Sequence, residues 1–290
     1  MKGFAGSVVA RPVNLVLQPG VTGTVRGSGS TVAYIEVDGI VVAITGRTVP
    51  AMPNGITVLQ QHGLQAFHHG ESVEFDPDGI RSAEATVSLV HPRWWDPRMP
   101  QWTDAAGALL ANGKQIWWRL RLARTDDPVE MVERLARAGF ATASDADGRV
   151  GLEALFRSVA EGDPELARRA GELLIGRGPG LTPEGDDFLA AALATLYACE
   201  PSLAWQRRDV IAWRSAVAPA ELLERTTRLS STLLVFAESG WVSEPVQTLF
   251  DLEAPFEEWH RSLTRLKRVG HGTGRAWAAG CAATAILLMR

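Results

Sequence analysis

Cysteine is scarce in this sequence, with only Cys199 and Cys281 among 290 residues. Both lie in stretches of small apolar residues with a helical pattern, and neither has a neighbour with metal-ligand spacing. So few cysteines exclude a disulfide-stabilised scaffold and argue against a structural zinc site. We predict that both are buried free thiols.

Long apolar segments and an excess of positive charge are also missing. No stretch approaches the roughly 20 apolar residues that span a bilayer, and the apolar run at the N-terminus is too short for a secretion signal. The chain has 29 basic and 33 acidic residues, a net charge of -4, which does not indicate a general affinity for nucleic acid. We therefore expect a cytoplasmic protein that binds neither membranes nor nucleic acid.

The first part of the chain has the pattern of β-strands. Its apolar runs are short and β-branched, and glycines separate them. Asp38-Gly39, between two such runs, predicts a hairpin. The expected strands are Val8–Ala10, Asn14–Leu17, Thr31–Val37, Ile40–Ile44, Ser72–Phe75, Ala85–Val90 and Gln115–Leu122. This pattern predicts a mainly antiparallel β domain, a barrel or a sandwich, over residues 1–125.

The period of the apolar residues changes from two to 3.6 near Thr125–Pro128, so residues 126–290 are predicted to form an all-helical domain. Asp127-Pro128 and Asp163-Pro164 are typical helix starts. The expected helices are 128–139, 152–160, 164–174, one opening at Thr182 and Pro183, 203–216, 220–238, 243–251, 255–269 and 273–289. The predicted fold class is therefore α+β.

The most distinctive stretch runs from Gly176 to Leu189 and reads Gly-Arg-Gly-Pro-Gly-Leu-Thr-Pro-Glu-Gly-Asp-Asp-Phe-Leu. Thr182 is a good N-cap and Pro183 suits the first helical position. Glycines before a helix start leave N–H groups free and place the positive end of the helix dipole beside a ligand. The stretch therefore predicts an anion-binding loop that opens a helix.

Three acids follow this loop, Glu184, Asp186 and Asp187. Carboxylates in a first turn stabilise the helix dipole but repel a bare anion. Two interpretations remain open: the acids only cap the helix, or they hold a cation or a substrate N–H beside an anion.

The whole string resembles the signature of the family named for AllH, a subunit of the oxamate carbamoyltransferase of allantoin degradation. Thr226–Ser230, Gly270–Gly274 and Val13–Leu15 support the resemblance, which covers most of the chain in order. It implies a carbamoyl-transfer role shared with other subunits. The Ser-Thr-Arg-Thr phosphate loop of the common carbamoyltransferases is missing, so the resemblance implies a different fold for this chemistry.

The second glycine cluster, Gly270-His-Gly-Thr-Gly274, repeats the design of the first, so the two loops are predicted to converge on one small ligand; the alternative is two ordinary helix connections. The candidate catalytic residues are Asp186, Asp187 and His271, with Asp187 the first choice for deprotonating or orienting the attacking nitrogen. The candidates for binding substrate or phosphate are Gly178, Gly180, Leu181, Thr182, Thr226, Ser230, Gly272, Thr273 and Gly274. Arg177 and Arg275 are further candidates for a substrate carboxylate.

The leading functional hypothesis is a subunit of, or a stand-alone, carbamoyltransferase in purine (allantoin) nitrogen catabolism. Its substrates would be carbamoyl phosphate and a small amide or ureido acid, oxamate or oxalurate, and its partners other carbamoyltransferase subunits or further copies of this chain. One alternative is a noncatalytic metabolite-binding or assembly subunit. Another is a hydrolase of an amide or ureido bond in which Asp186 and Asp187 hold Mg²⁺; no other cofactor and no metal ligands are predicted.

The first half of the chain contains five of the ten tryptophans and four of the six histidines. Trp94, Trp95, Trp102, Trp117 and Trp118 can form a stacking platform, but core and interface roles are more common for large aromatic residues. The spacing of the four histidines, His62, His68, His69 and His91, matches no familiar metal-ligand set, which favours loop or surface roles.

Overall fold

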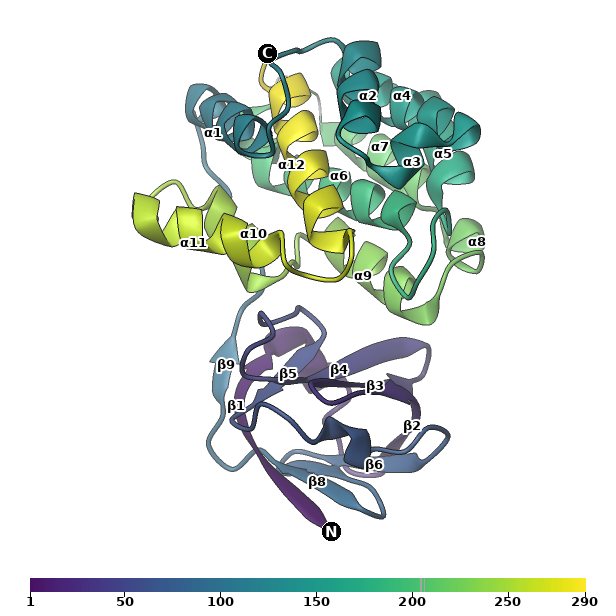
Figure 1. The fold of residues 1–290 in the computed structure, drawn as a ribbon, viewed down its shortest axis with the longest axis vertical. Coiled ribbons are helices and arrows are strands. Elements are labelled where there is room, and N and C mark those ends of the chain that lie inside the picture. The colour runs from purple at the N-terminus through teal and green to yellow at the C-terminus, as the bar shows by residue number, and fades with distance from the viewer. Residues whose placement is uncertain (204, 206) are drawn as a thin grey trace. The chain divides into compact units, whose positions relative to one another are not determined.

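The computed structural model describes residues 1–203, 205 and 207–290 (Figure 1). The chain divides into two compact units. The first contains residues 1–97 and 242–244, and the second contains residues 98–241 and 245–290.

The first unit is a β-barrel. Its strands lie in the order β5-β4-β3-β2-β6-β7-β8-β1, and an additional pairing of β1 with β5 closes the ring. The ninth strand, β9, pairs in parallel with the end of β1. The strands are β1 Lys2–Ala10, β2 Val21–Ser28, β3 Val32–Val37, β4 Ile40–Gly46, β5 Gly55–Val58, β6 Ser72–Asp76, β7 Gly79–Arg81, β8 Ala85–Ser88 and β9 Arg93–Trp95.

The hairpin between β3 and β4 shows how local sequence determines this barrel. Buried and partly exposed residues alternate along β3, as expected when one strand face covers a core. At the turn, Asp38 and Gly39 have φ of 48° and 81°, the left-handed values that a two-residue hairpin turn of this type requires. Val37 pairs with Ile40 across it, so the predicted hairpin is confirmed.

One predicted strand of this unit is wrong. Asn14 and Leu15, predicted to begin a strand, belong to the 3₁₀-helix η1, Arg11–Leu15. Pro12 stands at the start of η1, where its fixed φ favours a helical turn and its missing N–H costs nothing. A second short 3₁₀-helix, η2, covers Leu64–Ala66.

The second unit is helical, so the predicted α+β fold class is confirmed. Its helices are α1 Ala106–Arg119, α2 Pro128–Arg137, α3 Ala141–Ser144, α4 Ala146–Glu161, α5 Pro164–Leu174, α6 Glu184–Cys199, α7 Arg207–Val217, α8 Ala220–Leu223, α9 Arg228–Glu238, α10 Glu244–Phe250, α11 Phe256–Leu266 and α12 Thr273–Leu288, with the 3₁₀-helix η3 at Glu200–Ser202. None of the described helices combines the length and apolar composition needed to cross a membrane.

Helices α6 and α12 form the centre of this unit and pack directly against each other (Figure 1). Both are buried along nearly their whole length, which their alanine-rich sequences allow. Small residues let them approach closely: a Cβ at Gly280 of α12 would come within 2.7 Å of the Ala191 Cβ of α6. Cys199 and Cys281 are buried free thiols, and burial raises both pKa values to about 12.

The predicted strand Gln115–Leu122 is also wrong, because Gln115 to Arg119 form the last turns of α1. The arginine alternation from Arg119 to Arg124 imitates a strand. Over the longer segment, Leu109, Gly113, Ile116 and Trp117 are buried at helical spacing, and Gly113 lies against α12. Packing over four turns therefore overrides the local alternation.

The helix predicted over residues 220–238 is interrupted. It divides into α8 and α9, and Thr227 becomes the N-cap of α9, accepting from the Ser230 N–H. Two predicted caps are confirmed: Asp127 and Asp163 accept from first-turn N–H groups of α2 and α5. Residues 204 and 206 of the helix predicted over residues 203–216 lie outside the described residues, and α7 begins at Arg207.

Candidate functional site

The loop between α5 and α6 has a backbone that depends on its glycines. Gly176, Gly178 and Gly180 have φ of 76°, 121° and 95°, values that residues with a Cβ rarely adopt. Gly176 also needs space, because a Cβ there would lie 2.5 Å from the Arg225 carbonyl oxygen. The loop thus passes closely over the segment that joins α8 to α9.

Helix α6 begins one residue later than the sequence predicts, and this changes the role of Thr182. Pro183 is the N-cap, without a side-chain cap, and the helix starts at Glu184. Thr182 is therefore not the cap. Its Oγ1 lies 2.8 Å from Oγ1 of Thr273, the first residue of α12.

This Thr182–Thr273 hydrogen bond joins the two glycine-rich helix starts. Gly274, in the first turn of α12, fits there because a Cβ would collide with the Leu266 carbonyl oxygen at the end of α11. The α11–α12 turn is therefore tight, and it brings Thr273 to the α6 loop. That one ligand uses both loops remains a prediction.

Asp186 holds the loop and the α8–α9 segment together. Its side chain is 2% exposed. Oδ1 accepts from the Gly176 N–H at 2.8 Å, and Oδ2 accepts from the Thr226 hydroxyl. Burial raises the pKa of Asp186, while hydrogen bonds from Thr226, Gly176 and Ser230 oppose that rise. Asp186 is thus an internal acceptor for three parts of the chain.

Asp187 is 3% exposed and differs from Asp186 in its hydrogen bonding. Its Oδ2 is buried and has no hydrogen-bond partner among the described residues. Burial raises its pKa well above the usual value, and the neighbouring Asp186 charge adds to the effect; Thr273 and Trp277 lower it. This environment favours the neutral, protonated acid.

Two residues that the sequence prediction left out of the site connect its parts. The Thr227 hydroxyl donates to the Leu181 carbonyl at 2.5 Å. Glu184 accepts from the Thr142 N–H at 2.6 Å, and a Cβ at Gly272 would lie 3.5 Å from its other carboxylate oxygen. The N-cap position of Thr227, three residues before Ser230, is the sequence signal that could have identified it.

Thr226 precedes α9, so it does not share a helix face with Ser230. Both side chains nevertheless reach Asp186. The structure therefore brings Thr226 and Ser230 together through a shared acceptor, and the turn before α9 supplies the geometry.

Free backbone donors lie on both loops. Among the described residues, the N–H groups of Gly178, Gly180 and Leu181 donate to no protein acceptor, and all three residues are exposed. The N–H groups of Gly272 and Thr273 also have no protein acceptor there. Such donors beside helix starts can bind an anion.

The two arginines predicted to meet a substrate carboxylate are engaged elsewhere. Arg177 pairs with Asp145 at 2.5 Å and Asp147 at 3.2 Å. Arg275 donates to the Ala138 carbonyl, and its guanidinium lies 4.7 Å from the centre of the Phe140 ring. Both therefore stabilise the helical unit.

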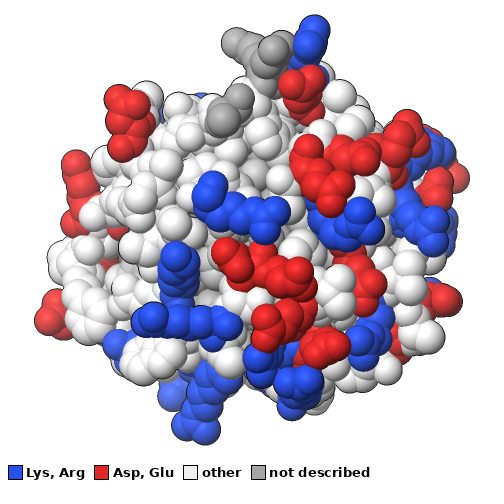
Figure 2. All heavy atoms as spheres, turned by 90° about the horizontal axis from the view of Figure 1, so that it is seen from above, with Lys and Arg blue, Asp and Glu red and all other residues white. Residues whose placement is uncertain are grey.

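Other basic side chains lie on segments that flank the loops. Arg225, Lys267 and Arg268 are exposed and form no ion pair within the described part of the chain. Seen from above, acidic and basic side chains are interspersed over the visible face (Figure 2).

His271 is exposed and has no side-chain hydrogen bond among the described residues. Trp117 is buried and so cannot serve as a stacking surface, whereas Trp94, in the barrel unit, and Trp118, in the helical unit, are exposed. The described residues contain no cluster of three or more His, Cys, Asp or Glu side chains that could hold a metal ion.

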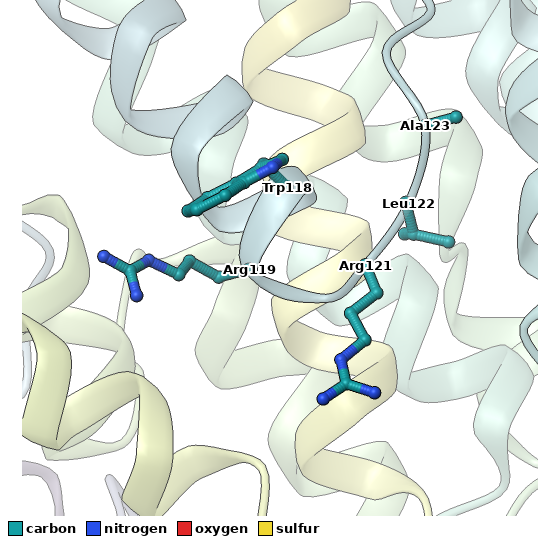
Figure 3. Close-up of a pocket in the computed structure, with 5 residues that line it drawn as sticks. All are labelled: Trp118, Arg119, Arg121, Leu122 and Ala123. Atoms are coloured by element: carbon teal, nitrogen blue, oxygen red, sulfur yellow. The ribbon is translucent and has the colours of Figure 1, made fainter.

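An open pocket of about 500 Å³ lies at the end of α1 (Figure 3). Its lining consists of Trp118, Arg119, Arg121, Leu122 and Ala123. None of these is a predicted site residue, so this pocket is separate from the glycine loops.

A family model matches part of the chain. Residues 174–285 match the family described as oxamate carbamoyltransferase subunit AllH. The chain is therefore similar to the AllH family over this region, which is less than half of its length. Searches of curated proteins and of solved structures found no match.

The region that matches the AllH family begins at the last residue of α5 and ends within α12. It therefore contains both glycine-rich loops, the two buried aspartates and the segment between α8 and α9. The family description ties this part of the chain to oxamate carbamoyltransferase.

Proposed function

We propose that this chain is a carbamoyltransferase-type enzyme or a subunit of one, acting on carbamoyl phosphate and a small amide or ureido acid such as oxamate or oxalurate. The proposal includes a role in allantoin nitrogen catabolism, a cytoplasmic location, and assembly with other carbamoyltransferase subunits or further copies of this chain. The family description supports the reaction class.

The observation that carries the proposal is the 2.8 Å contact between Thr182 and Thr273. It brings the starts of α6 and α12 together, each with backbone N–H groups that no described residue accepts from. Two helix starts side by side double the number of donors that an anion can reach. Phosphate and the carboxylate of oxamate are anions that such donors can bind.

In the proposed reaction, the amide nitrogen of oxamate attacks the carbonyl carbon of carbamoyl phosphate. A C–N bond forms, the C–O bond to phosphate breaks, and the nitrogen loses one proton. Loop N–H groups would hold the leaving phosphate and the oxygen on which negative charge grows. The reverse reaction would use oxalurate and phosphate.

We assign the carboxyl groups roles that follow from their surroundings. Asp186 already accepts hydrogen bonds from the protein, so it positions the loop over the α8–α9 segment. Asp187 is buried and favours its neutral form, so it supports Thr273 better than it would serve as a base. The exposed His271 is then the better candidate for receiving the proton.

Mg²⁺ does not fit the two aspartates. Asp186 already accepts from Gly176, Thr226 and Ser230, and the two aspartates are only 2% and 3% exposed, whereas Mg²⁺ requires accessible oxygen ligands. The hydrolase alternative that places Mg²⁺ on Asp186 and Asp187 loses its support.

The test is thermal unfolding of the full chain with carbamoyl phosphate, phosphate, oxamate or oxalurate. A ligand at about 100 times its dissociation constant should stabilise the fold by roughly 2.7 kcal/mol. Thr182→Val and Thr273→Val should each weaken binding about 10-fold or more, because a hydrogen bond to a charged group contributes about 1.5–3 kcal/mol.

Thr264→Val is the matched control, since the Thr264 hydroxyl donates to the His260 carbonyl within α11. Equal binding in all three valine variants would contradict the proposed site. If carbamoyl phosphate binds but no oxalurate forms with any partner chain present, the noncatalytic alternative is favoured. The burial of both candidate catalytic aspartates is the observation that favours the noncatalytic alternative.

A further inference from the structure

The aromatic residues at the end of α1 and the start of α11 form an exposed platform outside the proposed site. Trp118 is 60% exposed and Phe256 is 53% exposed. The Arg119 guanidinium lies 5.1 Å from the Trp118 ring centre and 5.7 Å from the Phe256 ring centre. We call these three residues together with Arg121 the α1–α11 patch.

Buried residues support the aromatic side of the patch. The Phe256 ring stacks on Trp259 with 6.2 Å between ring centres and 12° between planes. Trp259 is buried and donates to Asn112 Oδ1 at 2.9 Å, and Asn112 donates to the Leu249 carbonyl at 2.6 Å. A preformed aromatic surface loses little conformational entropy when a partner binds.

The patch carries positive charge without an internal counterion. Within the described residues, Arg119 and Arg121 pair with no carboxylate, and the buried Arg119 Nε has no hydrogen-bond partner. On the following helix, in contrast, Arg134 and Arg137 each pair with a glutamate four residues earlier. In Figure 3, Trp118 and Arg119 project from the end of α1, and Arg121 points away from Arg119.

Two general features of proteins explain only part of the composition of the α1–α11 patch. A cation in the last turn of a helix is stabilised by the helix dipole, and single exposed apolar residues are common. Neither explains why two exposed aromatic rings contact one arginine whose Nε is unsatisfied. Trp and Arg are the residues most enriched at the energetic centres of protein interfaces.

We propose that the α1–α11 patch is a docking surface for a different protein chain that presents carboxylates beside a large apolar side chain. The carboxylates would pair with Arg119 and Arg121, and the apolar side chain would enter the pocket against Trp118 and Leu122. Docking of the patch on its own copy is disfavoured, because the arginines of two copies would meet.

The test uses the full-length chain and a random peptide display library. We expect wild-type protein to enrich sequences that place Asp or Glu beside a large apolar residue. A synthetic peptide of the enriched sequence should bind at least about 10-fold more weakly to Trp118→Ala and to Arg119→Gln, the loss typical of a hot-spot residue. Trp94→Ala is the matched control, because Trp94 is 42% exposed but lies in the barrel unit.

Three outcomes would overturn the proposal. In the first, every acidic sequence that wild type enriches is also enriched by Trp118→Ala, or wild type enriches none. Another is a peptide affinity that is the same in all variants. The third is a homodimer, measured by light scattering, that dissociates on Trp118→Ala, since the patch would then bind a second copy. Thermal unfolding of each variant checks that the fold is retained.

Discussion

Two adjacent aspartates, Asp186 and Asp187, differ entirely in how the fold uses them. Asp186 receives donors from three parts of the chain, whereas one Asp187 oxygen has none among the described residues. An unpaired buried carboxylate is costly, so the group avoids the cost by keeping its proton. Their sequence neighbourhood is the same, and only the packing distinguishes them.

The raised pKa of Asp187 predicts a specific pH dependence of stability. An unfolded aspartate has a pKa of about 3.9, so the folded chain binds more protons than the unfolded chain between that value and the folded pKa. The Asp187 contribution to stability is therefore present at low pH and is lost as pH rises above about 4 toward the folded pKa. Asp187→Asn should remove this loss, because an amide does not titrate.

Urea unfolding of both proteins between about pH 4.5 and pH 8 measures this effect, because a tenfold difference between the acid dissociation constants of the folded and unfolded chains equals about 1.4 kcal/mol. The stability of wild type should fall relative to that of Asp187→Asn as pH rises. Asp126→Asn is the control, since Asp126 is exposed and its substitution should give a curve parallel to wild type. A parallel curve for Asp187→Asn as well would contradict the assignment.

At the scale of elements, the backbone conformation of the α5–α6 loop depends on Gly176 in particular. Gly176→Ala places a Cβ at a residue with φ of 76° and against the Arg225 carbonyl. Strained backbone of this kind costs about 1–3 kcal/mol, so the variant should unfold at lower temperature. Its ligand affinity should fall as well, because the loop must move away from the α8–α9 segment.

Gly107→Ala provides the matched comparison. Gly107 lies in the first turn of α1, and a Cβ there meets no atom within 4 Å. Alanine in a helix should be neutral or stabilising by up to about 1 kcal/mol. If both alanine variants unfold at the same temperature as wild type, the strain argument for Gly176 is wrong.

The sequence predicts elements well where local pattern and packing agree. The Asp38-Gly39 hairpin and the Asp127 and Asp163 caps depend on neighbouring residues, and the structure has all three. The failures occur where tertiary contacts decide. Packing on α12 makes Gln115 helical, and the contacts of Thr226 and Thr227 with distant residues accompany the break between α8 and α9.

In the candidate site too, local sequence predicts some features and tertiary packing decides the others. Glycine spacing indicates both loops, but the contact between Thr182 and Thr273 joins residues 91 positions apart. The burial that distinguishes Asp187 from Asp186, and the ion pairs that occupy Arg177, are likewise properties of the packed unit. Residue types were therefore predictable, whereas their protonation and availability were not.

For the whole molecule, the proposed site lies within one unit. Its loops, both aspartates and the segment before α9 belong to residues 98–241 and 245–290, and the AllH match falls entirely within the same unit. The barrel supplies none of the residues proposed to bind the ligand. Ligand binding should therefore change backbone protection in the helical unit alone.

Hydrogen–deuterium exchange of the full chain with and without carbamoyl phosphate tests this division. We expect slower exchange in peptides that cover Gly176–Glu184, Arg225–Ser230 and Gly270–Gly274. Bound ligand would accept hydrogen bonds from the free N–H groups of the two loops. It would also restrain the segment between α8 and α9, which is joined to the α5–α6 loop. Strands β1 to β8 should exchange at unchanged rates, and Thr273→Val should reduce the protection in all three segments together. Protection confined to the barrel strands would mean that the ligand binds there, and the proposed roles of Thr182 and Thr273 would then be wrong.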